Sequence, residues 1–84
     1  MALRMYQRNI RAKEVEEVLL SGEIIENYSE SEPLPTYLIL GYTKKKKALH
    51  IVVGIDTIDE MIWAITAYEP SFREWEEGFR KRRG

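Results

Sequence analysis

The pattern of apolar and polar positions divides most of the chain into one helix and four short strands. In residues 12–21, Val15, Val18 and Leu19 recur at intervals of three and four, the spacing of one face of an α-helix. Glutamates occupy the first turns of this segment, where the helix dipole favours negative charge, and Ser21-Gly22 supplies a stop. Aliphatic and aromatic runs bounded by turn residues predict strands at 23–28, 36–43, 48–55 and 61–68.

The two ends of the chain are also expected to be helical. Residues 2–10 are a candidate for a short first helix, with apolar positions at Leu3, Met5, Tyr6 and Ile10. Near the C-terminus, Ser71 is placed to cap a helix from about residue 72 to 82, because its aromatic residues recur at three and four: Phe72, Trp75 and Phe79. We therefore expect Trp75 and Phe79 to be largely buried.

Short turns between consecutive strands favour an antiparallel meander. Because side chains alternate between the faces of a strand, the bulkier sets are expected to pack against the helices: Leu49, Ile51 and Val53, and Met61, Trp63 and Ile65. His50, Thr66 and Tyr68 then share the second, more polar face. The predicted fold class is α+β, a single domain over residues 1–84 with one or two N-terminal helices, a four-stranded antiparallel meander and a C-terminal helix.

Composition changes this picture mainly by exclusion. The 84 residues include no cysteine and one histidine, which excludes a disulfide framework, a cysteine nucleophile and a cysteine-based zinc site. With one histidine and no cysteine, a metal site would have to rest on carboxylates, and no Gly-rich phosphate loop or nucleophile elbow occurs, so we expect neither a metal nor a cofactor. The chain opens without a basic region followed by an apolar run, and no segment approaches the ~18 apolar residues of a membrane span. We expect a cytoplasmic protein.

The charge is unevenly distributed. The formal net charge is −1, yet eight of the thirteen basic residues lie in two runs, at 44–47 and 80–83. A near-neutral total argues against nucleic-acid binding driven by bulk charge alone, although it permits a local basic face.

His50 and Tyr68 are the side chains best suited to proton transfer. An imidazole titrates near neutral pH and can act as a general acid or base, and a phenol at a strand end can bind phosphate. The ordinary alternatives are a core histidine bonded to a backbone group, which sequence alone makes about twice as probable, and a tyrosine that only packs on the sheet.

Arginines supply the candidate phosphate contacts. Arg4 and Arg8 lie four residues apart, on one face if their segment is helical, where two guanidinium groups can clamp a phosphate. Arg80 and Arg82 in the C-terminal run can bind an RNA backbone. The alternatives are a solvated face for the first pair and favourable charge at a helix C-terminus for the second. The lysines at 44–47 are typical of a solubilising turn.

Several segments, spread over nearly the whole chain, resemble the DUF4258 family. They are Ala2-Leu3-Arg4-Met5 with Arg8 and Ile10, residues 15–19 (VEEVL), 22–26 (GEIIE), 35–38 (PTYL), 49–53 (LHIVV) and 65–70 (ITAYEP), and Trp75. The family is largely uncharacterised and is grouped by fold with small toxin-like nucleases related to RelE and MqsR.

The resemblance implies a metal-independent ribonuclease toxin of a type II toxin–antitoxin pair. Its substrate would be RNA and its partner a zinc-ribbon antitoxin of the MqsA type. The polar residues at recurring family positions are His50, Tyr68, Arg4 and Arg8. Many relatives carry a histidine and several further residues before the Ala-Leu-Arg-Met stretch, where this chain has Met1, so a few N-terminal residues of the family are expected to be absent.

Two interpretations follow. In the first, His50 or Tyr68 transfers the proton of an attacking RNA 2′-hydroxyl, while Arg4, Arg8, Arg80 and Arg82 stabilise the phosphate charge. In the second, the domain is a non-catalytic protein-interaction module. Basic side chains gathered around His50 would favour the first interpretation, and scattered ones the second.

Overall fold

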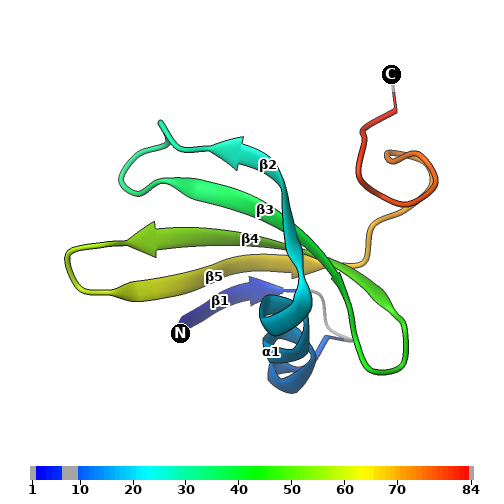
Figure 1. Cartoon of the computed structure of the whole chain (residues 1–84), viewed down its shortest axis with the longest axis horizontal. Coiled ribbons are helices and arrows are strands. Elements are labelled where there is room, and N and C mark those ends of the chain that lie inside the picture. Colours follow the sequence, from blue (N-terminus) through cyan, green and yellow to red (C-terminus); the bar gives the residue numbers. More distant parts are fainter. Residues whose placement is uncertain (1, 7–9, 84) are drawn as a thin grey trace.

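The computed structural model describes residues 2–6 and 10–83, with side chains from residue 10 onward. The elements follow the order β1 (Ala2–Tyr6), α1 (Ala12–Ser21), β2 (Glu23–Tyr28), β3 (Thr36–Tyr42), β4 (Ala48–Asp56) and β5 (Met61–Tyr68). The described strands form one sheet in the order β1-β5-β4-β3-β2 (Figure 1). The pairs from β2 to β5 are antiparallel, as the turn spacing predicts, and β1 runs parallel to β5.

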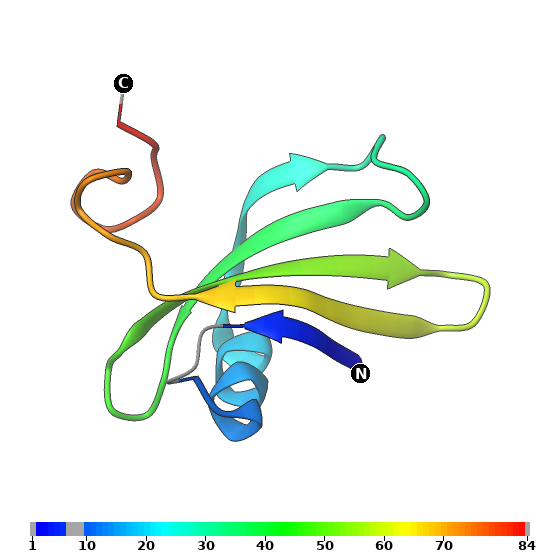
Figure 2. The same ribbon diagram turned by 180° about the vertical axis from the view of Figure 1, so that it is seen from behind.

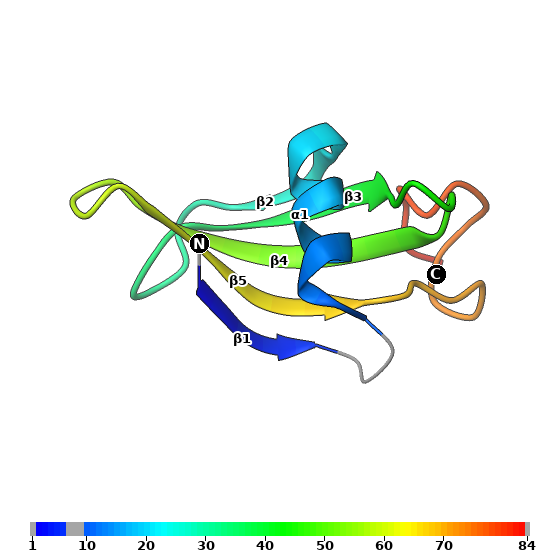
Figure 3. The ribbon, with the colours of Figure 1, turned by 90° about the horizontal axis from the view of Figure 1, so that it is seen from below.

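The predicted helix and the core beneath it are confirmed. α1 begins where the backbone N–H of Arg11 donates to Glu14 Oε1 at 3.1 Å, the glutamate half of a capping box, and the N–H of Glu14 donates to the Arg11 carbonyl oxygen in place of a Ser or Thr side chain. The helix lies across one face of the sheet (Figure 3), and its Val15 and Val18 are buried there. They share a core cluster with Ile10, Leu49, Ile51, Val53, Ala64 and Ala67. Within residues 2–6 and 10–83, no helix is long and apolar enough to cross a membrane.

The expected first helix is wrong in its described part. Residues Ala2–Tyr6 form an edge strand whose Ala2 pairs with Trp63 and whose Met5 pairs with Thr66. A helix this short is marginal in water, whereas the free edge of β5 offers backbone partners for the whole segment. The pairing with β5 therefore makes this segment a strand. Nothing in the spacing of apolar and polar residues within the segment predicts it.

The expected C-terminal helix is also wrong. Residues 70–83, hereafter the C-terminal segment, form turns and a bridge between Trp75 and Arg82. Gly78 has φ +89° and Phe79 has φ +58°, values outside any α-helix, and the N–H of Glu76 bonds across this turn to the carbonyl of Lys81. Trp75 is buried as expected, but Phe79 is only half-buried and Phe72 is exposed. The fold is therefore mostly β with one short helix, instead of α+β with helices at both ends.

The predicted faces hold for β4 and fail in part for β5. A register shift between Val52 and Val53 places Thr66 opposite Val52 and Ala64 opposite Val53, so Ile65 is an extra residue. Beyond this bulge the alternation of β5 is reversed. Ala64 consequently joins Ala67 in the core beneath α1. Trp63 and Ile65, which we expected against the helices, line a cavity on the opposite face instead.

Candidate functional site

His50 and Tyr68 meet on the sheet face away from α1. The two residues are register partners on β4 and β5, and His50 Nδ1 lies 3.1 Å from the Tyr68 hydroxyl. Their rings meet edge to face with centroids 5.3 Å apart. The alternation predicted this juxtaposition, and the structure brings the two residues together.

Both nitrogens of the His50 ring have partners. Nε2 lies 2.8 Å from the backbone carbonyl oxygen of Phe79. Because a carbonyl only accepts, Nε2 carries the proton and Nδ1 accepts from the Tyr68 hydroxyl. Burial lowers the pKa of His50 and raises the pKa of Tyr68. Both shifts favour a neutral imidazole and a protonated phenol, the states that this arrangement requires.

The C-terminal segment covers the pair. It stands on the side of the sheet away from α1, at the end where β5 finishes (Figure 1 and Figure 2). The Trp75 ring packs edge-on against His50 with centroids 4.3 Å apart, and Trp75 is itself 1% exposed. His50 is 0% exposed as a result.

An ion pair between Glu26 and Arg82 holds the C-terminal segment in place over His50 and Tyr68. Arg82 donates from Nε to Glu26 Oε2 at 2.9 Å and from a terminal nitrogen to Oε1 at 3.1 Å. The guanidinium also lies 4.6 Å from the centre of the Trp75 ring, and the Tyr28 hydroxyl donates to Glu26. The Arg82 guanidinium lowers the pKa of Glu26, and Glu26 in turn raises the pKa of Arg82.

Sequence reasoning missed Glu26 and Tyr28. They lie on β2 and meet residues from the far end of the chain, so no local spacing connects them with Arg82. Period-two alternation does place both side chains on one face of the strand, which was the available signal.

The four arginines predicted to bind phosphate do not gather at one site among the described residues. Arg80 forms an ion pair with Glu23, and Arg82 with Glu26. Arg4 belongs to β1, but its side chain and the whole of Arg8 lie outside the described residues. In the lysine turn, Lys47 binds Glu14 of α1 at 2.9 Å. Among the described basic groups, Arg82 is the one that the structure brings close to His50.

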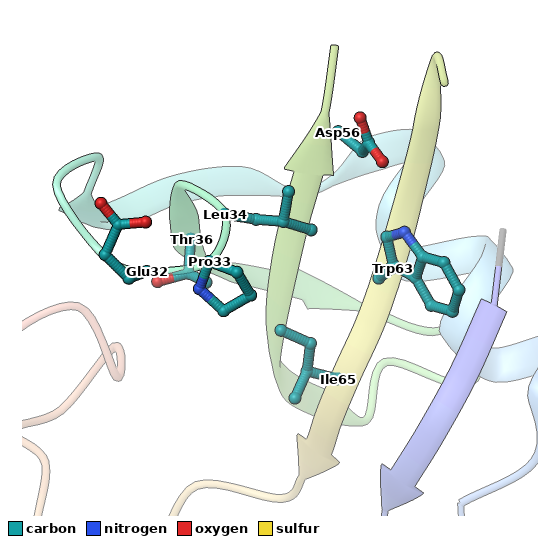
Figure 4. A pocket seen from close by; sticks show the side chains of 7 residues that line it. All are labelled: Glu32, Pro33, Leu34, Thr36, Asp56, Trp63 and Ile65. Carbon is teal, nitrogen blue, oxygen red and sulfur yellow. The ribbon is translucent and has the colours of Figure 1, made fainter. Parts of the chain in front are cut away.

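A separate cavity of about 410 Å³ opens at the other end of the same sheet face (Figure 4). Leu34 and Pro33 from the β2–β3 loop and Trp63 and Ile65 from β5 form its apolar walls. The remaining lining residues are polar: Glu32, Thr36 and Asp56. Among the described residues, no group of three or more histidine and carboxylate side chains is placed to hold a metal ion.

The fold and these sites define a small, mostly β domain with one helix on a largely antiparallel sheet and a histidine–tyrosine pair on the opposite face. The family described as domain of unknown function DUF4258 matches residues 1–69, and the chain belongs to that family. The match ends at Glu69, so the C-terminal segment lies beyond it. No curated protein and no solved structure matches the chain significantly.

Proposed function

We propose that this domain is a non-catalytic protein-interaction module in which His50 has a structural role. The state of His50 carries the proposal: its ring is fully buried, and its two nitrogens bind the Tyr68 hydroxyl and the Phe79 carbonyl. A general acid or base must come within about 3 Å of the proton it transfers. The groups that come this close to the His50 ring nitrogens are the Tyr68 hydroxyl and the Phe79 carbonyl, both of the same chain.

The placement of cations supports the same function. Glu23 and Glu26 compensate Arg80 and Arg82, and Glu14 and Glu69 lie within ion-pair distance of Lys47. An RNA-cleaving site needs positive charge directed at a phosphate. Here these guanidinium groups hold the C-terminal segment against β2.

Two kinds of surface suit a binding role. β2 and β1 are the outer strands of the described sheet, and an edge strand can accept a further strand from a partner. On β2, Ile24 is 55% exposed. The cavity beside Trp63 adds an apolar recess with polar groups at its rim, the usual composition of a binding pocket.

Metal-independent RNA cleavage by a type II toxin is the second candidate. It is favoured by His50 and Tyr68, which meet on one face beneath a segment that lies outside the family match, and by Arg82 of that segment, which lies close to Trp75 over the pair. In this function a displaced C-terminal segment would expose the His50 imidazole and the Tyr68 hydroxyl. A zinc-ribbon antitoxin of the MqsA type would then be the partner.

An RNA-cleavage assay separates the two functions. Purified wild-type protein, His50→Ala and Tyr68→Phe are incubated with total RNA in the presence of EDTA, with Arg73→Gln as an exposed control. We expect intact RNA in every case and lower melting temperatures for His50→Ala, because His50 links β4 to the C-terminal segment.

Cleavage by the wild type and by Arg73→Gln that His50→Ala loses by about 10²–10⁴-fold would establish the ribonuclease instead. Growth arrest on expression of the wild type but not of His50→Ala, relieved by an antitoxin partner, would lead to the same conclusion.

A further inference from the structure

The C-terminal segment is a structural unit of its own, joined to the sheet through the end of β5 (Figure 1). The backbone N–H of Arg83 donates to the carbonyl oxygen of Glu74 at 2.8 Å, and its guanidinium donates to the carbonyl oxygen of Trp75 at 2.9 Å. The Phe72 and Phe79 rings pack together with centroids 4.7 Å apart. In the described part of the chain, the backbone–backbone hydrogen bonds of this segment stay within it. The segment therefore forms its turns without bonds to the backbone of the sheet.

A small set of contacts holds the segment on the sheet. The Trp75 ring packs on the His50 imidazole with centroids 4.3 Å apart. His50 Nε2 donates to the carbonyl oxygen of Phe79 at 2.8 Å. Arg82 donates twice to the carboxylate of Glu26. A buried aromatic anchor, one backbone acceptor and one charged pair are contacts typical of a bound peptide.

Complementary charge favours a basic ligand beside β2. Glu23 pairs with Arg80, and Glu26 pairs with Arg82. The side chains of the two arginines are 59% and 57% exposed. Exposed ion pairs contribute little to stability, because water and salt screen them. A competing segment therefore has chiefly the packing of Trp75 to replace.

The surface beneath the segment lies within the family match. Glu26, His50 and Tyr68 fall within residues 1–69, whereas the segment follows that range. Without the segment, this surface presents the His50 Nε2–H donor, the Tyr68 ring beside it and the carboxylate of Glu26. Such a surface fits an aromatic side chain, a backbone carbonyl and a guanidinium group presented together.

We propose that this surface is a further binding site of the domain and that the C-terminal segment is its ligand in cis. A partner protein displaces the segment with a turn of the same chemistry, in which a tryptophan lies beside an arginine as Trp75 lies beside Arg82. The partner's indole packs on His50, one of its carbonyl oxygens accepts from Nε2, and its guanidinium binds Glu26. This inference rests on the proposed interaction function and specifies the partner and its competitor within this chain.

Titration of the full chain with a fluorescein-labelled peptide of residues 70–83 tests the proposal. This probe carries the proposed chemistry in the arrangement that the structure shows to fit. The full chain with Trp75→Ala, whose own segment has lost its anchor, should bind the peptide with a dissociation constant on the order of 10–100 µM, measured by fluorescence anisotropy. The wild type should bind at least about tenfold more weakly, because its own segment competes at a high effective concentration.

Peptide variants separate chemistry from exact sequence. The peptide with Trp75→Ala should bind at least about tenfold more weakly, because it lacks the buried anchor. The peptide with Arg73→Ala and Glu77→Ala, two exposed positions, should bind within about twofold of the original.

Matched variants of the chain identify the site. In the Trp75→Ala background, Glu26→Gln should weaken peptide binding roughly fivefold, whereas Glu30→Gln, an exposed glutamate of the β2–β3 loop, should change it by less than about twofold. Circular dichroism checks that each variant keeps its sheet. The double variant Arg80→Gln, Arg82→Gln, which loses only exposed ion pairs, is titrated in parallel and should bind the peptide about fivefold more tightly than the wild type.

Four outcomes would overturn the proposal. They are no binding to either weakened variant up to about 1 mM peptide, equal binding of the peptide with Trp75→Ala, wild-type affinity equal to that of both weakened variants, and equal losses in Glu26→Gln and Glu30→Gln. Wild-type dimers that the peptide dissociates would make a second copy of the chain the occupant, which also contradicts it. The RNA assay decides the proposed function separately, since intact RNA without peptide binding removes only this inference.

Discussion

His50 Nε2 donates to the backbone carbonyl oxygen of Phe79, which lies 29 residues further along the chain, over a distance of 2.8 Å. This bond joins a central strand to a segment without regular secondary structure. Trp75 packs on the same imidazole, and Arg82 lies over Trp75. The single histidine is therefore a point of attachment for the C-terminal segment, and its protonation state should affect the whole fold.

Acidification through the histidine range should destabilise the protein. Burial lowers the pKa of folded His50, whereas the unfolded chain titrates near about 6.5. Below that value the unfolded chain binds a proton that the folded chain excludes, so the stabilisation is complete above about 6.5 and is lost as the pH falls towards the folded pKa. Urea unfolding between about pH 7.5 and 5.5 should show a falling free energy of unfolding.

Two variants check this assignment. His50→Gln should abolish the slope, since the chain has one histidine. Glu26→Gln should retain it, because the pKa of Glu26 is already lowered by Arg82 and its contribution is lost only in more acidic solution. A slope that persists in His50→Gln would show that another group titrates.

Trp75→Ala should destabilise the protein by about 3–5 kcal/mol, the usual cost of removing a buried aromatic side chain. Trp75 is 1% exposed, whereas Phe72 in the same segment is 58% exposed. Phe72→Ala should therefore cost less than about 1 kcal/mol. Thermal unfolding monitored by circular dichroism measures both, and equal melting temperatures for wild type and Trp75→Ala would refute the docking of this segment.

Gly41→Ala should separate α1 from the sheet. A methyl group at Gly41 would lie 2.7 Å from Val18 Cγ1, a buried atom of α1. We expect a loss of about 1–3 kcal/mol. In a Val18→Ala background, Gly41→Ala should cost less than it does in the wild type, because Val18→Ala removes the clashing atom. Additive losses in a double-mutant cycle would exclude the clash.

The Glu26–Arg82 pair should contribute modestly and depend on salt. The side chain of Arg82 is 57% exposed and that of Glu26 20% exposed. A double-mutant cycle with Glu26→Gln and Arg82→Gln should give a coupling of about 0.5–1 kcal/mol that decreases between about 0.05 and 1 M NaCl. Zero coupling at low salt would show that packing of Trp75 alone holds the segment.

Local sequence patterns predicted the elements that local interactions determine. The three- and four-residue spacing of Val15, Val18 and Leu19 predicted α1, and alternation placed His50 and Tyr68 on one face. These predictions succeed because periodicity reflects which side of an element is buried.

The failures all involve partners distant in the chain. β1 is a strand because β5 has a free edge, and the aromatic spacing after Pro70 gives a turn at Gly78 instead of a helix because Trp75 docks on His50. The bulge at Ile65 reverses the remaining alternation of β5 and directs Trp63 to the cavity. The Glu26–Arg82 pair has no sequence signature at all.

The parallel pairing of β1 with β5 also sets an order of events during synthesis. Ala2 leaves the ribosome before the other strands of the sheet, yet its strand partner Trp63 lies 61 residues further along the chain. The meander from β2 to β5 forms between neighbours and can assemble as it appears, whereas the N-terminal strand must wait for the last strand of the sheet. Of the strands in the described sheet, β1 is therefore the last to meet its partner although it is the first to be made.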